Sequence, residues 1–190
     1  MAFQSFEATT TPDQAAPRVA ALRGELVREG LAGFLVPRAA AQQGEYVAPR
    51  DDRLAWITGF TGSAGFAVIL RDTAAIFVDG RYTLQVRNQT DGHIFTPVDW
   101  PKTQLGPWAA DSLPAGSVLG FDPWLHTRDE IARARAAAPD VTFRAVDNLI
   151  DRIWHDQPDR PRAKAVRVPK AGAGKGDETK RREIAQIVAN

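Results

Sequence analysis

The chain has 190 residues, of which 44% are hydrophobic and 25% are charged, proportions typical of a globular protein. Its 24 basic and 23 acidic residues leave a formal net charge of +1, which favours neither a nucleic-acid nor an anionic-membrane partner because phosphate binding needs a concentrated basic face. Since the sequence contains no cysteine, disulfide bonds, thiolate metal sites and a thiol nucleophile are excluded.

The N-terminal segment has neither a basic region nor an apolar core, so it is not interpreted as a signal peptide. No apolar run approaches the roughly 20 residues that span a bilayer. We therefore expect a cytoplasmic protein without a membrane partner.

Residues 1–11 are polar and aperiodic and are expected to form a loose N-terminal arm. Apolar residues then recur at helical spacing, which predicts an amphipathic helix that starts near Pro17 and stops at Gly30. A short buried strand over residues 33–36 follows. A helix followed by an apolar strand is typical of an α/β domain.

Two apolar runs, residues 66–70 and 74–78, flank the polar turn 71–73. This arrangement predicts a β-hairpin. Both runs are apolar nearly throughout, so they are expected to be central strands that are covered on both faces.

The pattern continues to alternate up to about residue 155. Thr127 and Glu130 have the spacing of a helix capping box. We expect helices near 51–57, 80–87, 105–113, 127–139 and 148–154, and strands at 93–98, 117–121 and 141–145.

Residues 156–176 are rich in proline, glycine and charge and are interpreted as a linker after a main domain at 12–155. Residues 177–190 are amphipathic. We expect them to be the first helix of a truncated second domain.

Several motifs do not support a catalytic site. The three histidines, His93, His126 and His155, lie far apart and are interpreted as surface or loop residues. Ser63 is not in a GxSxG elbow. The glycine-rich segment 172–176 lacks the residues of a phosphate loop and fits a linker.

The carboxylates Asp72, Asp79 and Asp122 each lie at a strand end, but turn and cap roles explain them. Arg81 is the candidate binding residue, because it follows a buried strand at the edge where α/β folds place binding groups. Its guanidinium suits a carboxylate or a carbonyl-rich ligand. A salt bridge with Asp79 or Glu45 is the structural alternative.

Six segments of the sequence carry a further pattern: EYVAP (45–49), WITGFTGSAG (56–65), FVDGRYTLQ (77–85), GFDP (120–123), NLIDRIW (148–154) and RP (160–161). Together they resemble the N-terminal domain of Xaa-Pro aminopeptidases (aminopeptidase P) of the creatinase and prolidase family. Thr61 departs from the aspartate that many relatives carry at that position.

The resemblance implies a ribonuclease H-like, three-layer α-β-α domain with a mixed central sheet. It also implies a second, similar domain and then a catalytic pita-bread domain, whose two divalent metal ions, usually manganese, are held by ligands outside this chain. The expected role of this chain is therefore non-catalytic, and the 190-residue chain alone is expected to be inactive.

For the full-length enzyme, the resemblance implies removal of an N-terminal residue that precedes proline, with this domain shaping substrate access and assembly. A homodimer is expected, and Arg81 is implied to contact the substrate peptide. Two alternatives stay open: a stand-alone peptide- or protein-binding module, and an enzyme acting on creatine or another small guanidino compound.

Overall fold

The structure is a computed structural model that describes residues 10–189, so most of the arm expected over residues 1–11 lies outside the described residues. The chain divides into two compact units, residues 1–160 and 161–190. Each unit is described by itself.

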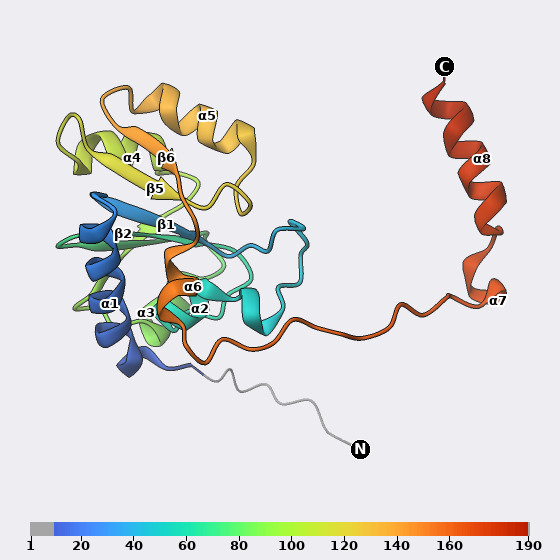
Figure 1. Ribbon diagram of the computed structural model, residues 1–190, viewed down its shortest axis with the longest axis horizontal. Helices are drawn as coiled ribbons and strands as arrows, with labels where there is room; N and C mark the ends of the chain where they lie inside the picture. Colours follow the sequence, from blue (N-terminus) through green and yellow to red (C-terminus); the bar gives the residue numbers. More distant parts are fainter. Residues whose placement is uncertain (1–9, 190) are drawn as a thin grey trace. The chain divides into compact units, whose positions relative to one another are not determined.

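The first unit is built on one six-stranded mixed sheet (Figure 1). Its strand order is β4-β3-β2-β1-β5-β6; β2 runs antiparallel to both of its neighbours, and the other five strands share one direction. The strands are β1 (Gly33–Pro37), β2 (Phe66–Leu70), β3 (Ala74–Val78), β4 (Phe95–Asp99), β5 (Val118–Phe121) and β6 (Thr142–Ala145).

Helices cover both faces of this sheet (Figure 1). They are α1 (Ala15–Arg28), α2 (Arg53–Thr58), α3 (Thr83–Gln89), α4 (Leu105–Ser112), α5 (Arg128–Ala137) and α6 (Leu149–Ile153), with short 3-10 helices at Pro12–Gln14 and Pro49–Asp51.

Two hydrophobic clusters fill the space between the sheet and the helices, one on each face of the sheet. Helices α1, α2, α3 and α6 pack in one cluster against alternate sheet residues such as Phe34 and Ile76. Helices α4 and α5 pack in the other, against residues such as Leu35 and Phe77. The expected three-layer α-β-α arrangement is therefore confirmed.

The predicted hairpin is also confirmed, since Phe66 pairs with Phe77 and Ile69 with Ala74 across β2 and β3. Every residue of β3 is buried, as expected for a central strand with helices on both faces. The capping box of α5 forms as predicted: Thr127 Oγ1 accepts from the Glu130 amide, and the Glu130 carboxylate accepts from the Thr127 amide.

Among the elements that begin later than predicted, two follow turns that explain the shift. The helix expected from Gly80 begins at Thr83, since Asp79 first accepts hydrogen bonds from the Arg81 and Tyr82 amides. The strand expected from residue 93 begins at Phe95, after a turn in which the Asp91 carbonyl accepts hydrogen bonds from the Ile94 and Phe95 amides.

Helix α6 connects three of the motifs noted in the sequence. Asn148 caps it by accepting from the Ile150 amide, and its side-chain amide donates to Asp122 at 3.0 Å. At the other end of the helix, Trp154 stacks on Trp56 of α2, with ring centroids 5.1 Å apart. These motifs, far apart in sequence, therefore form one packing unit.

The second unit contains α7 (Lys170–Ala173) and α8 (Asp177–Val188). Ile184, Ile187 and Val188 of α8 are exposed and share one helix face. The amphipathic helix expected over residues 177–190 is observed as α8, which ends at Val188.

Candidate functional site

The candidate binding residue Arg81 and a pocket both lie at one edge of the sheet, which we call the carboxyl edge. Strands β1, β3, β4, β5 and β6 end there, and β2 begins there. Open α/β sheets bind ligands at this edge because the loops that leave the strands converge on it.

Arg81 lies at the carboxyl edge, in the turn between β3 and α3. Its guanidinium is held by Asp79: Nη2 donates to Oδ2 at 2.7 Å, and Nε donates to Oδ1 at 3.0 Å. The Asp79 carboxylate also accepts from the Arg81 amide at 2.9 Å. Of the two salt-bridge partners considered from the sequence, Asp79 is the one observed.

The Arg81–Asp79 pair leaves the guanidinium accessible, since 65% of the Arg81 side chain is exposed. Hydrogen bonding to Arg81 lowers the pKa of Asp79 below its usual range, and the same bond raises the pKa of Arg81. Arg81 is thus an oriented cation whose outer N–H groups face solvent.

The glycine-rich loop 61–65 is tied to α3 beside this turn. The Thr61 amide donates to Gln89 Oε1 at 3.0 Å, and Gln89 Nε2 donates to Thr61 Oγ1 at 2.9 Å. Ser63 Oγ and the Tyr82 hydroxyl share a 2.5 Å hydrogen bond, which lowers the pKa of Tyr82. The loop therefore supports the Arg81 turn.

Large apolar side chains are exposed in the segments that leave three of these strands. Tyr46 follows β1, Leu84 follows β3 and Trp124 follows β5; each of them is at least 75% exposed. Exposed apolar side chains of this size favour contact with another surface where they form a patch.

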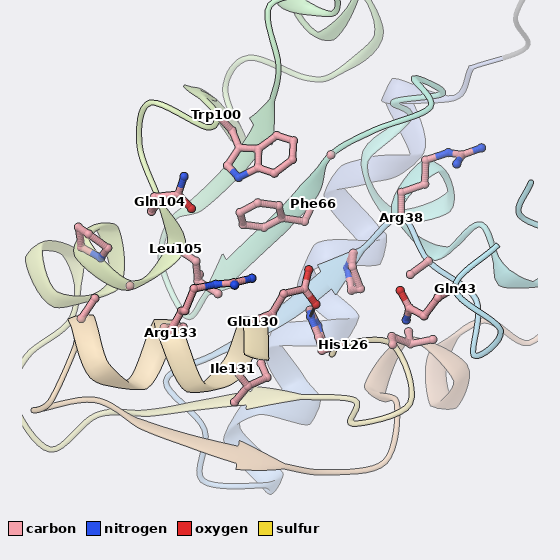
Figure 2. A pocket seen from close by; sticks show the side chains of 18 residues that line it. Arg38, Gln43, Phe66, Trp100, Gln104, Leu105, His126, Glu130, Ile131 and Arg133 are labelled. Carbon is pink, nitrogen blue, oxygen red and sulfur yellow. Dashed lines mark ion pairs between the residues drawn. The ribbon is translucent and has the colours of Figure 1, made fainter. Parts of the chain in front are cut away.

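A pocket also opens at the carboxyl edge, on the face that carries α4 and α5 (Figure 2). Its volume is about 700 Å³, and its lining includes Arg38, Phe66, Trp100 and His126. Burial lowers the pKa of His126, with weaker opposing effects of Glu130 and Asp122.

The structure separates other residues considered from the sequence. Asp72 lies in the β2–β3 turn, at the edge opposite to Asp79. Within residues 10–189, no three His, Asp or Glu side chains gather in a group that could hold a metal ion. No helix among the described residues is both long and apolar enough to cross a membrane.

The interpretation of His126 as an ordinary surface or loop histidine is only half right. It lies in the loop after β5, but its side chain is 9% exposed and packs edge-to-face on Phe121. The pocket itself was not predicted. Its only sequence signal is that Arg38, Trp100 and His126 all follow the ends of strands.

A family model described as the Creatinase/Prolidase N-terminal domain matches residues 18–153. A probable Xaa-Pro aminopeptidase P from Pyrenophora teres is 37% identical over 178 residues, which cover 86% of this chain and 26% of the relative. Xaa-Pro aminopeptidase 2 from Sus scrofa is 32% identical over 161 residues, 83% of this chain and 24% of the relative. The chain thus spans about a quarter of the length of these relatives.

Solved structures agree with this match. An X-prolyl aminopeptidase from Caenorhabditis elegans, described as a cytosolic enzyme with a di-nuclear active site, superposes with a TM-score of 0.72 at 30% identity, over 76% of this chain and 26% of that one. The N-terminal domain of the cytoplasmic peptidase PepQ from Mycobacterium tuberculosis superposes at 0.57 with 19% identity, over 72% of this chain and 98% of that one, which supports the fold alone.

The fold and the matches together define an α/β domain of the kind that occurs at the N-terminus of creatinase-like peptidases. The chain belongs to the creatinase/prolidase N-terminal domain family. The resemblance to Xaa-Pro aminopeptidases is confirmed by its similarity to these enzymes.

Proposed function

We propose that this chain acts as the non-catalytic N-terminal domain of an Xaa-Pro aminopeptidase, which removes an N-terminal residue preceding proline. The observation that carries the proposal is the family match over residues 18–153, together with relatives that are Xaa-Pro aminopeptidases and extend well beyond the matched region. Within this proposal, the protein is cytoplasmic and the full-length enzyme is a homodimer.

Two divalent metal ions, with manganese as the first candidate, are expected in such an enzyme. The described residues of this chain do not fit a metal ion, because no suitable group of ligands gathers among them. We therefore derive no step of hydrolysis from this chain and propose that the metal site lies in a further, C-terminal domain.

The first test compares the 190-residue chain with the full-length protein, each supplied with manganese and an X-Pro peptide. We expect cleavage only by the full-length protein. If the full-length protein binds such peptides but neither binds metal nor cleaves, the alternative of a peptide-binding module replaces the proposal.

Within this enzyme, the domain would shape substrate access and assembly through its carboxyl edge. Two observations support this role: the oriented cation Arg81, and the exposed apolar residues Tyr46, Leu84 and Trp124 in the segments that follow β1, β3 and β5. The exposed face of α8 supports the further proposal that residues 177–190 begin a second domain.

We propose that Arg81 donates to a carboxylate or carbonyl of the substrate peptide. The bond to Asp79 fixes the guanidinium, and the exposed N–H groups stay available for a ligand. Loss of a charge-assisted hydrogen bond should lower kcat/KM of the full-length enzyme by about tenfold or more in Arg81→Ala.

The matched control is Arg87→Ala, which removes an exposed arginine from α3 in the same region. Asp79→Asn should have a smaller effect than Arg81→Ala, because the cation remains but loses its charged partner. If Arg81→Ala and Arg87→Ala give the same kcat/KM, the substrate contact is wrong, while the cleavage test above is unaffected.

A further inference from the structure

The pocket on the α4/α5 face is a separate feature from the Arg81 turn. It lies between the carboxyl ends of β1, β4 and β5, the start of β2, the first turn of α4 and one side of α5 from Glu130 to Ala137 (Figure 2). Its volume of about 700 Å³ falls within the range of about 300–1,000 Å³ typical of small-molecule sites.

Flat apolar surface dominates one side of this pocket. Phe66 and Trp100 meet edge-to-face, with ring centroids 6.3 Å apart, and both are only half-buried. Leu105, Leu125 and Ile131 add aliphatic surface. Such a wall favours an aromatic ring, which gains both area burial and edge contacts with the two aromatic side chains.

His126 supplies a buried polar atom that needs a partner. Its side chain is 9% exposed, and its Nε2 has no hydrogen-bond partner among the described residues. A buried polar atom without a partner costs free energy, so native structures rarely leave one unexplained.

The protonation of His126 indicates what this partner should be. Glu130 Oε2 lies 4.0 Å from Nδ1, too far for a hydrogen bond but near enough to favour the proton on that nitrogen. A neutral imidazole protonated at Nδ1 presents Nε2 as an acceptor. The matching ligand group is therefore an N–H or O–H donor.

Arg133 is the cation in the lining that is available to an anion. Arg38 and Arg133 both line the pocket, and neither has a carboxylate within ion-pair distance among residues 10–189. However, Arg38 Nη1 donates to the carbonyls of Glu45 and Ser63, at 3.2 and 3.1 Å, and its guanidinium points away from the pocket, whereas Arg133 extends toward it (Figure 2). The one lining carboxylate, Glu130, is engaged in capping α5.

We propose that this pocket binds a small aromatic carboxylate that carries an N–H or O–H group. The ring lies against Phe66 and Trp100, the carboxylate is bound by Arg133, and the donor group bonds to His126 Nε2. A free aromatic acid and the C-terminal aromatic residue of a peptide share this chemistry. The site is independent of the Arg81 contact and of hydrolysis.

The test uses indole-3-acetate as the probe, titrated into the ¹⁵N-labelled 190-residue chain and followed by NMR. We expect saturable binding with a Kd on the order of 1 mM or tighter, as for a well-placed ligand of this size. The amides lining the pocket and the Trp100 indole N–H should shift. The peptide Gly-Gly-Trp, titrated in parallel, distinguishes the two sources by its relative affinity.

Two analogues test the polar contacts separately. Indole-3-acetamide lacks the negative charge and should bind about tenfold more weakly, because it loses a charge-assisted contact. 1-Naphthaleneacetate keeps the charge but lacks the N–H, so its affinity should fall about three- to tenfold.

Variants then assign these contacts to residues. Arg133→Ala should weaken indole-3-acetate binding several-fold, while Arg128→Ala, which removes another exposed arginine of α5 outside the pocket lining, should not. His126→Phe preserves a ring against Phe121 and should abolish the preference for indole-3-acetate over 1-naphthaleneacetate. If His126→Phe fails to fold, the two probes on the unmodified chain still test the N–H contact.

Three results would overturn the proposal. They are the absence of saturation at 10 mM probe, where a Kd of about 1 mM predicts near-saturation; shifts located away from the pocket; and equal binding of all three probes. Binding to the 190-residue chain but not to the full-length protein would show that another part of the protein fills the pocket, which also contradicts a ligand site.

Discussion

Arg81 and Asp79 share one short turn, and that turn limits how far the guanidinium can move. The Asp79 carboxylate accepts from both the backbone amide and the side chain of Arg81. An arginine held in this way loses less rotamer entropy when it binds a ligand than a free one would. This is why the Arg81–Asp79 pair is compatible with both a structural and a binding role.

At Gly59 the backbone conformation and a neighbouring carbonyl both require a residue without a Cβ atom. It ends α2 with a φ of +84°, and a Cβ there would lie 2.5 Å from the Gln89 carbonyl oxygen. Gly59→Ala should therefore destabilise the domain by roughly 1–3 kcal/mol. Urea unfolding followed by tryptophan fluorescence measures this loss.

Gly92→Ala provides the control for Gly59→Ala, because a Cβ at Gly92 meets no atom within 4 Å and its φ is not positive. Its stability should stay within about 0.5 kcal/mol of the unmodified chain. Equal losses in the two variants would contradict the assigned role of Gly59.

His126 should make stability depend on pH. Burial lowers its pKa in the folded state below the value of about 6.5 expected when unfolded. Between these two pKa values the unfolded chain binds more protons, so the free energy of unfolding falls as the pH is lowered through this window.

The prediction for His126 is checked by measuring urea unfolding from pH 7.5 down to pH 5. We expect the unmodified chain to lose stability over this range more steeply than His126→Gln, which cannot bind that proton. Identical pH profiles for the two proteins would show that His126 does not contribute.

At the scale of elements, α6 is bound to α2 through an ion pair between buried Arg53 and partly exposed Asp151. Arg53, with 7% of its side chain exposed, donates through Nε and Nη2 to Asp151 at 2.7 and 2.9 Å, and its Nη1 donates to Asp51. Such bidentate geometry offsets part of the desolvation free energy of the Arg53 guanidinium. The stacking of Trp56 on Trp154 adds an aromatic contact between the same two helices, α2 and the end of α6.

Removing Arg53 should leave Asp151 without its main partner. We expect Arg53→Met to destabilise the domain by about 1–3 kcal/mol, against a change within about 0.5 kcal/mol for the exposed control Arg87→Met. A double-mutant cycle with Asp151→Asn should show strong coupling. Additive losses would mean that the two side chains do not stabilise each other.

At the scale of the whole molecule, the first unit contains its own core. Both hydrophobic clusters draw all of their residues from the part of the chain between Ala15 and Trp154. Removal of residues 161–190 should therefore leave the thermal midpoint of this unit within about 2 °C, since neither cluster contains a residue of that segment.

A second truncation provides the contrast. Ending the chain at residue 148 removes Leu149, Ile150 and Trp154 from the first cluster. This shorter chain should lack cooperative unfolding in calorimetry. If the chain ending at residue 160 also lost cooperativity, the first unit would not be independent.

The locally encoded features of this protein could be predicted from the sequence. The β2–β3 hairpin, the capping box of α5 and the face of α1 each depend on residues within a few positions of one another. Periodicity and capping act over that range, so they are readable in order along the chain. Arg81 could be identified as a candidate binding residue for the same reason, since it lies in the turn that follows a buried strand.

The candidate sites required the strand order as well. Arg38, Trp100 and His126 come together because β1, β4 and β5 end at one edge of the sheet, and nothing in their local sequence specifies that order. The same holds for Asn148 and Asp122, which meet through the pairing of β5 with β6.

The sequence by itself thus determined the elements, the family and Arg81 as the candidate binding residue, because these depend on short-range pattern and motif. Only the tertiary structure decided which polar groups are buried and which meet. Burial of His126 and formation of the pocket result from packing α4 and α5 on the sheet. Such packing brings together residues that lie far apart in the chain.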